Sequence, residues 1–388
     1  MTGSGPNAPV TPNAPVALGE PPITAWIGLN RGFAPLFSDP AIAALFGTEA
    51  TLAAMLDFER ALTRALGASG AVDGASAEAA LQAMEGFAPD LAAIERASLT
   101  DGLPVPEFVR QLKQHVSATA GDRALAAVHI GATSQDLLDT GLAITLRDAS
   151  DILVARIEGL MAGLDALNTE WGDCPLMGRT RMQAALPITV DRRIAAWRAP
   201  FPLHLERLDE LTPRIARVQF GGPVGRRTEP EGKANEIAHH MARELGLHDA
   251  PCWHTDRSGV VEFGQWLALV CGSLAKIGQD VALMSQQGLN EIELTGGGTS
   301  SAMAHKRNPV LAEHLVAQAR FAAGLAGTLH HAAIHEQERS GAAWALEWMT
   351  LPLLTETCGA ALGHARRLIA SIGGMGGMNA SRGPPLPE

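Results

Sequence analysis

The chain has 388 residues, of which 46% are hydrophobic, and its 30 Lys and Arg against 41 Asp and Glu give a net charge of −11. This length predicts two or three domains, and the acidic balance excludes a generally basic nucleic-acid binder. Aromatic residues make up only 4%, with no Tyr, which favours a helical protein over a sandwich or barrel. No apolar run reaches the ~18 residues of a membrane span, so we expect a soluble protein with no membrane partner.

The N-terminal residues and the cysteines indicate the cellular compartment. Residues 1–30 are rich in Pro, Gly and Asn and lack the basic and apolar regions of a signal peptide, so they are predicted to be a disordered extension. The four cysteines, Cys174, Cys252, Cys271 and Cys358, show no CxxC spacing, which argues against a zinc knuckle or a redox motif. Scattered thiols without a signal peptide favour a reducing, cytoplasmic compartment.

Helical periodicity begins near Leu36. Residues 40–67 have apolar side chains at helical spacing and end in a glycine, which predicts one helix with Gly67 as its stop. Short helices continue through Leu112. We therefore expect residues 31–115 to form a small helical N-terminal domain.

Four longer apolar seams predict the rods of an antiparallel helical bundle over residues 116–355. The seams run from Leu146 to Leu167, from Val190 to Val218, from Leu267 to Met284, and from Pro309 through Leu311, Leu315 and Phe321 to Leu325. The second should be kinked or broken at Pro200, Pro202 and Pro213. No strand-like alternation competes with the helices. Seams this apolar suggest that some of the helices pack against another subunit. Residues 356–388 are predicted to be a short helix and a Gly/Pro-rich tail.

The segment His129–Asp136 is the first of three polar stretches between the rods. Thr133 or Ser134 can cap a helix that starts at Gln135, and Asp136 can complete a capping box. The segment is either a plain helix cap or, with His129, an anion-binding site at a helix start. The segment alone favours the plain cap, because such caps are common.

The second stretch, Gly178–Gln183, carries two arginines two residues apart. Arg179 and Arg181, beside Thr180 and Gln183, could hold a carboxylate by bidentate pairing. The alternative is a solvated basic turn.

The third stretch covers residues 296–309 and begins with three glycines, which suit a lid that closes over a ligand. Asn308 and Pro309 are predicted to be the N-cap and first residue of the next helix. Lys306 and Arg307 then lie at the positive end of that helix, which is unfavourable by up to ~1 kcal/mol each unless an anion is bound. We therefore favour a binding site over a plain basic loop.

Downstream, residues 335–344 cluster titratable groups around Arg339, which is either surface charge or part of a cleft marked by the Ser-Gly break. The sequence shows no HExxH motif, paired-carboxylate spacing or Gly-rich phosphate loop, so no metal or cofactor is expected. Together the polar stretches predict an anion site at the ends of a bundle. Such a site is typical of a lyase or isomerase that acts on a polyanionic acid.

Three motifs carry a family resemblance. The loop Gly298–Pro309 (GTSSAMAHKRNP) resembles the signature loop of the fumarase/aspartase superfamily, HIGATSQDLLDT at 129–140 resembles its TSxDxxxT segment, and Gly178–Gln183 resembles its GRTHxQ segment. The motifs occur in the family's order across roughly residues 36–352. The resemblance implies an all-α fold, a long antiparallel bundle with a small N-terminal domain. It also implies a homotetramer with a twenty-helix core, whose active sites are each built from three subunits.

Within that superfamily, residues 335–352 resemble bacterial 3-carboxy-cis,cis-muconate cycloisomerases. Adenylosuccinate lyases carry a Ser and an Arg for a nucleotide phosphate where this chain has Ala342 and Trp348. A phosphate there would lose charge-assisted hydrogen bonds worth about 1.5–3 kcal/mol each, which favours a small polycarboxylate substrate. The alternatives are a fumarate-releasing lyase of the adenylosuccinate lyase type and a non-catalytic helical structural protein.

The reaction that the resemblance implies is an intramolecular lactonisation through an aci-carboxylate, stabilised by preorganised donors. Ser300 is the implied proton donor, with Ser301 as the alternative, and Lys306 holds the aci-carboxylate. The implied substrate-binding residues are His129, Thr133, Ser134, Arg179, Thr180, Arg181, Gln183, Met303, Asn308 and Arg339.

Three departures from the family pattern bear on this prediction. Ala304 replaces a proline and should loosen the signature loop, and Arg181 replaces the histidine of GRTH, which excludes a histidine acid at that position. The chain also ends soon after the fourth rod, so we expect a truncated C-terminal domain.

Overall fold

The structure, a computed structural model, describes residues 32–295, 298–299 and 307–377. Its helices are α1 (Ala34–Phe37), α2 (Pro40–Leu45), α3 (Thr48–Ala68), α4 (Gly74–Glu85), α5 (Leu91–Asp101), α6 (Val105–Leu125), α7 (Ser134–Trp171), α8 (Val190–Arg198), α9 (Pro200–Ile215), α10 (Ala234–Leu245), α11 (Ser258–Met284), α12 (Val310–Ala332) and α13 (Ala342–Ala370). Its strands are β1 (Pro175–Thr180), β2 (Gln183–Thr189), β3 (Ile292–Leu294), β4 (Gly298–Thr299), β5 (Arg307–Asn308) and β6 (Ile372–Met375). The predicted all-helical class is confirmed.

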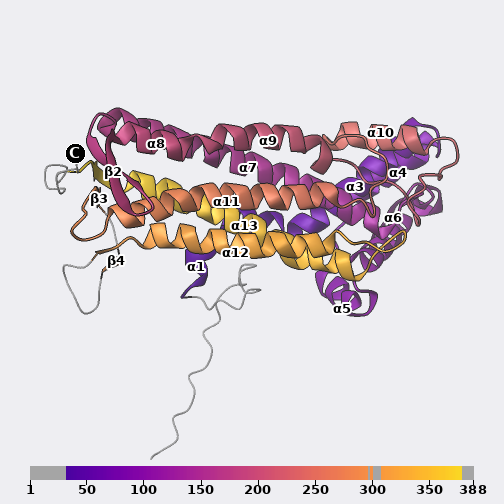
Figure 1. The fold of residues 1–388 in the computed structure, drawn as a ribbon. Coiled ribbons are helices and arrows are strands. Elements are labelled where there is room, and N and C mark those ends of the chain that lie inside the picture. The colour runs from indigo at the N-terminus through magenta and orange to yellow at the C-terminus, as the bar shows by residue number, and fades with distance from the viewer. Residues whose placement is uncertain (1–31, 296–297, 300–306, 378–388) are drawn as a thin grey trace, which may run out of the picture.

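The long helices form one elongated bundle, in which successive rods alternate in direction (Figure 1). The first predicted seam, from Leu146 to Leu167, lies within α7, and its seven apolar residues are at most 6% exposed. The seam from Leu267 to Met284 lies within α11 and is equally buried. Steps of three and four residues keep one face of each helix against its neighbours, so these two predictions are confirmed.

The proline-rich seam breaks where the sequence predicts. Helix α8 ends at Arg198 and α9 begins at Pro200, whereas Pro213 lies inside the last turn of α9. The fourth seam is only partly correct, because Leu315 is fully buried but Phe321 is 44% exposed. Six residues span about 1.7 helical turns, so Phe321 lies on a different face of α12 from Leu315.

Two predicted helix ends are wrong. Residues 40–67 form two helices that break at Gly47, and Gly67 lies inside α3 rather than ending it. A Cβ at Gly67 would lie 2.7 Å from the Cβ of Ala77, so this glycine allows α3 and α4 to approach closely. At α12 the N-cap is Pro309, one residue later than predicted, because Asn308 pairs in a strand.

The sequence did not predict the β-structure. Strands β1 and β2 form an antiparallel hairpin whose two-residue turn, Arg181 and Met182, has φ angles of 48° and 70°. Positive φ at both turn residues matches the twist of a hairpin. Neither strand shows a regular alternation of buried and exposed residues, which removes the usual signal. The pairs β3–β6 and β4–β5 lie at the same end of the bundle as this hairpin (Figure 1).

Two hydrophobic clusters make up the core. One follows the rods, and the other joins the N-terminal helices to the start of α7, to residues 216–220 and to α10. The predicted boundaries after residues 115 and 355 lie inside α6 and α13, while the predicted extension at 1–30 lies outside the described residues. The division into domains stays a prediction.

Helix α11 corrects the expectation that no segment is apolar enough to span a membrane. Its length and a mean hydropathy of 1.4 meet that criterion. It packs, however, against α9, α12 and α13, with Val270 and Leu274 fully buried (Figure 1). It is a core helix of the bundle.

Two core histidines are held neutral. The Nε2 atom of His204 lies 2.8 Å from Ser273 Oγ, and Nδ1 of His364 lies 2.9 Å from Gln318 Oε1. Burial is the main cause that lowers the pKa of each histidine to about 4, and a neighbouring arginine adds to it.

We expect these histidines to make the fold acid-sensitive. In the unfolded chain the two histidines bind protons near pH 6.5, and in the folded chain they do so only near pH 4. The free energy of unfolding should therefore fall as the pH drops through this window. Allowing for solvent screening, each group should contribute about 1–2 kcal/mol. Urea unfolding at pH 7, 5 and 4 measures the effect. His204→Gln and His364→Gln should each flatten the profile, and an unchanged slope would contradict this prediction.

Candidate active site

The first candidate segment lies at the N-terminus of α7. Thr133 is the N-cap, and the side chain of Asp136 accepts a hydrogen bond from Thr133 N at 2.9 Å, which confirms the predicted capping box. The helix begins at Ser134, one residue earlier than expected. The positive dipole end of the helix makes this a place where an anion can bind.

Asp136 has a larger role than a cap. Its carboxylate is fully buried and also accepts hydrogen bonds from Gly221 N and Gly222 N at 2.9 Å each. The Nε2 atom of His254 lies 2.9 Å from Asp136 Oδ1. This one side chain therefore fixes the start of α7 to two loops more than 80 residues away, which local spacing cannot reveal.

Arg339 reaches the same helix start from the loop between α12 and α13. Its Nη2 donates to Thr133 Oγ1 and its Nε donates to Gln135 Oε1, both at 3.0 Å. The structure thus brings together two residues that the sequence assigned to substrate binding, Thr133 and Arg339. A guanidinium beside a helix N-terminus is a strong site for a carboxylate.

His129 is held beside this segment by a residue that the sequence analysis missed. Its Nδ1 lies 2.5 Å from Oε1 of Glu59, whose side chain is fully buried on α3. His129 has a φ of 61°, which is uncommon for a residue with a side chain. The carboxylate fixes the orientation of the imidazole, as in many acid–base sites.

The second candidate segment is the hairpin at the opposite end of the bundle (Figure 1). Arg179 forms an ion pair with the buried Glu291, whereas Thr180, Arg181 and Gln183 are exposed at the turn. Helix α7 separates the hairpin from Thr133, and its 38 residues span about 57 Å at 1.5 Å per residue. One chain therefore does not bring Arg181 and Arg339 together around one carboxylate.

The third candidate segment lies at the same end as the hairpin. Gly298 pairs with Asn308 and Thr299 pairs with Arg307, so the two ends of the signature loop are joined. The assigned residues Ser300, Ser301, Met303 and Lys306, and also Ala304, lie outside the described residues. Their roles stay predictions.

A buried ionic network supports the first segment. Arg257 binds Asp139 through two hydrogen bonds of 2.8 and 3.0 Å and Glu347 through two of 2.8 and 2.5 Å. Gln135 Nε2 donates to Asp139 Oδ2 at 3.0 Å, and His335 Nε2 lies 3.5 Å from Glu347 Oε1. Through Arg257, the N-cap residue of α11, the network joins α7 to α13. Gln135 connects it to Arg339.

A sequence signal for this network exists. Asp139 lies seven residues before Leu146 and Glu347 lies four before Leu351, so both carboxylates occupy seam positions of apolar helices. A charge at a buried position needs a partner. The partner, Arg257, cannot be found from spacing. Among the residues that the structure describes, no three His, Cys, Asp or Glu side chains gather as a metal site.

Comparison with known proteins identifies the family. Residues 38–324 match the family model described as Lyase. The chain belongs to the fumarase/aspartase family of lyases. The family and fold predicted from the three motifs are thereby confirmed.

Individual relatives of this lyase have different activities. A 3-carboxy-cis,cis-muconate cycloisomerase of Pseudomonas putida is 37% identical over 348 residues, which are 88% of this chain and 82% of that enzyme. A nitrosuccinate lyase of Streptomyces davaonensis is 33% identical over 357 residues, 87% of this chain and 73% of that one. The crystal structure of the Pseudomonas putida 3-carboxy-cis,cis-muconate lactonizing enzyme matches with a TM-score of 0.81 at 36% identity, over 88% of this chain and 77% of the other.

Proposed function

We propose that this lyase is a cytoplasmic 3-carboxy-cis,cis-muconate cycloisomerase, which closes the substrate to its carboxy-muconolactone. The observation that carries the proposal is the contact of Arg339 with Thr133 and Gln135 at the start of α7. It provides a carboxylate site in a family whose relatives include such a cycloisomerase. The proposed reaction belongs to protocatechuate breakdown.

In the proposed mechanism one substrate carboxylate adds to a double bond and a proton is delivered to the carbon next to another carboxylate. Lys306 and Asn308 hold the carboxylate that becomes the doubly charged aci-form, which is the costliest species. Ser300 supplies the proton. Thr133, with Arg339 beside it, binds a second carboxylate.

The separation of the motifs supports a site shared between copies of this chain. Thr133 and Arg339 lie at one end of a rod of about 57 Å, and the hairpin and the Asn308 strand lie at the other. Met182 and Leu186 on the hairpin are 72% and 67% exposed. We infer a homotetramer in which antiparallel packing brings opposite ends of different chains together.

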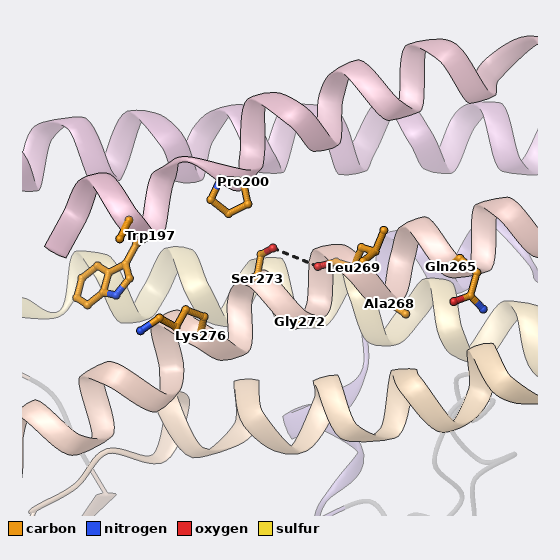
Figure 2. Close-up of a pocket in the computed structure, with 9 residues that line it drawn as sticks. Trp197, Pro200, Gln265, Ala268, Leu269, Gly272, Ser273 and Lys276 are labelled. Carbon is orange, nitrogen blue, oxygen red and sulfur yellow. Dashed lines mark hydrogen bonds between the residues drawn. The ribbon is translucent and has the colours of Figure 1, made fainter. Parts of the chain in front are cut away.

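A surface groove along α11 fits that inference. Figure 2 shows it between α11 and the junction of α8 and α9, with a volume of about 440 Å³, lined by Pro200, Gly272 and Ser273 among others. Leu269 at its side is 52% exposed. An apolar, small-residue groove on a rod is a surface against which another helix can pack.

The test is an absorbance assay on the purified protein with 3-carboxy-cis,cis-muconate. Loss of the diene absorbance with formation of the lactone supports the proposal, and no turnover by the folded protein overturns it.

The nitrosuccinate lyase relative keeps a fumarate-releasing lyase as the second candidate. Fumarate release from a substituted succinate, without muconate turnover, would establish that alternative. Turnover of adenylosuccinate is not expected, because Trp348, which is 38% exposed and packs at a tilt against Trp344, replaces the phosphate-binding arginine.

Complementation tests the shared site. Arg339→Ala should lower kcat/KM about 10–100-fold through loss of a charge-assisted contact, and Lys306→Ala should lower it further. Because the two residues are assigned to different chains of one site, co-expression of the two variants should restore about a quarter of the sites in mixed tetramers. Activity is measured by the same absorbance assay.

The matched control is co-expression of Arg339→Ala with Thr133→Ala. These two residues are in contact within one chain, so each site in a mixed tetramer keeps at least one defect. The shared site would be contradicted if activity returned in this control, or if it did not return when Arg339→Ala and Lys306→Ala are co-expressed.

A further inference from the structure

Cys252 lies in a pocket that the proposed reaction does not use. A cavity of about 530 Å³ is lined by Cys252, Arg226 and Arg227 among others. The thiol is half-buried, and Gln219 Nε2 donates to its Sγ at 3.2 Å. Gln219 Oε1 accepts from Trp253 N at 2.9 Å, which fixes the amide so that its NH₂ faces the sulfur.

His254 faces the same sulfur from the buried side. The histidine is 3% exposed, its Nε2 is bound to Asp136, and its Nδ1 has no hydrogen-bond partner among the described residues. A Cβ at Gly225 would lie 3.1 Å from Cys252 Sγ and 3.3 Å from His254 Nδ1. The thiol and the imidazole therefore face each other beside a position that only glycine fits.

The groups around the sulfur favour a thiolate. The amide N–H of Gln219 donates to it, and the imidazole of His254 faces it. Burial acts to raise the pKa of the Cys252 thiol, but the interactions with His254 outweigh it and lower that pKa below its ordinary value. Burial likewise acts to lower the pKa of His254, but Asp136 and Cys252 outweigh it and raise the pKa to about 9. This is the Cys–His–Asp order of an activated nucleophile.

We propose that Cys252, oriented and activated by His254 and Asp136, is a nucleophilic thiol that exchanges with small disulfides bearing carboxylates. The thiolate attacks one sulfur of the disulfide, a new S–S bond forms, and the other half leaves as a thiolate that takes up a proton from solvent. Exposed Arg226 provides the positive charge for the carboxylates. The other charged groups at the pocket are Arg227 and Asp249, which are 3.5 Å apart.

The site is connected to the candidate active site. Asp136 holds both His254 Nε2 and the backbone N–H of Thr133. A group attached to Cys252 would therefore lie two side chains away from the start of α7. The nucleophile itself does not depend on the proposed lactonisation.

Alkylation of the full chain tests the proposal, with Cys174, which is also half-buried, as the internal reference. We expect iodoacetamide, followed by mass spectrometry, to modify Cys252 at pH 6.5 at least about 10-fold faster than Cys174. Between pH 8.5 and 6.5 the Cys252 rate should fall less than about 3-fold, whereas an ordinary thiol slows by about 50-fold. A Cys252 rate that equals that of Cys174, or that falls by about 50-fold, would overturn the proposal.

Variants separate the parts of the proposal. Oxidised glutathione should add one glutathione to the wild type and to Cys174→Ser, but none to Cys252→Ser. Arg226→Ala should slow the glutathione reaction and leave the iodoacetamide rate unchanged; equal rates with glutathione would overturn the role of the charge. His254→Gln should slow alkylation at pH 6.5 at least about 10-fold, with folding checked by circular dichroism. If that variant does not fold, the wild-type pH profile decides.

Discussion

Replacement of Ser300 by Ala is expected to lower kcat by about 10²–10⁴-fold, the range for a lost general acid, while KM changes little. The serine is assigned to proton delivery and not to substrate binding. An ordinary hydroxyl is a poor acid, so the proposed role requires positive charge nearby, which we assign to Lys306. Steady-state kinetics with the muconate measures both constants.

Ser301→Ala is the matched control, because it removes the neighbouring hydroxyl of the same loop. It should lower kcat much less. If Ser301→Ala lost the activity and Ser300→Ala kept it, the proton donor would be Ser301. If both variants kept the wild-type kcat, neither serine would be the donor.

Arg257→Met is expected to destabilise the fold by about 3–5 kcal/mol, the cost of leaving buried carboxylates without their partner. Arg257 is the common partner of Asp139 and Glu347, and all three side chains are at most 2% exposed. A urea unfolding curve measures the change as a lower midpoint at an unchanged slope.

Arg214→Met provides the control for the loss of an arginine from an ion pair. Arg214 pairs with Glu262 on the surface, where both side chains are about half exposed, so the change should be at most about 1 kcal/mol. Combining Arg257→Met with Asp139→Leu and Glu347→Leu should restore part of the stability, because no buried charge then lacks a partner. If Arg257→Met and Arg214→Met lowered the free energy of unfolding equally, the larger cost that we assign to the buried network would be contradicted.

How much the sequence alone predicts differs between the start of α7, the buried helix seams and the hairpin. The four residues 133–136 predicted the capping box, which is present, and the resemblance of the motif at 129–140 implied the substrate-binding role of Thr133. The seams of α7 and α11 predicted which residues are buried, because helical periodicity is a local property. The hairpin was missed because neither strand carries a regular alternation of buried and exposed residues.

The amino-acid sequence by itself determined the helical class, the family motifs, the buried seams and the break at Pro200. Each of these depends on residues that lie within a few helical turns of one another in the chain. Only the tertiary structure decided which distant groups meet. The pairing of Arg339 with Thr133, of Glu59 with His129, and of Asp136 with His254 joins residues separated by 70 to 206 positions. No periodicity spans such separations, because these contacts depend on how the rods pack. The distance of about 57 Å between the hairpin and Thr133, by contrast, follows from the length of α7.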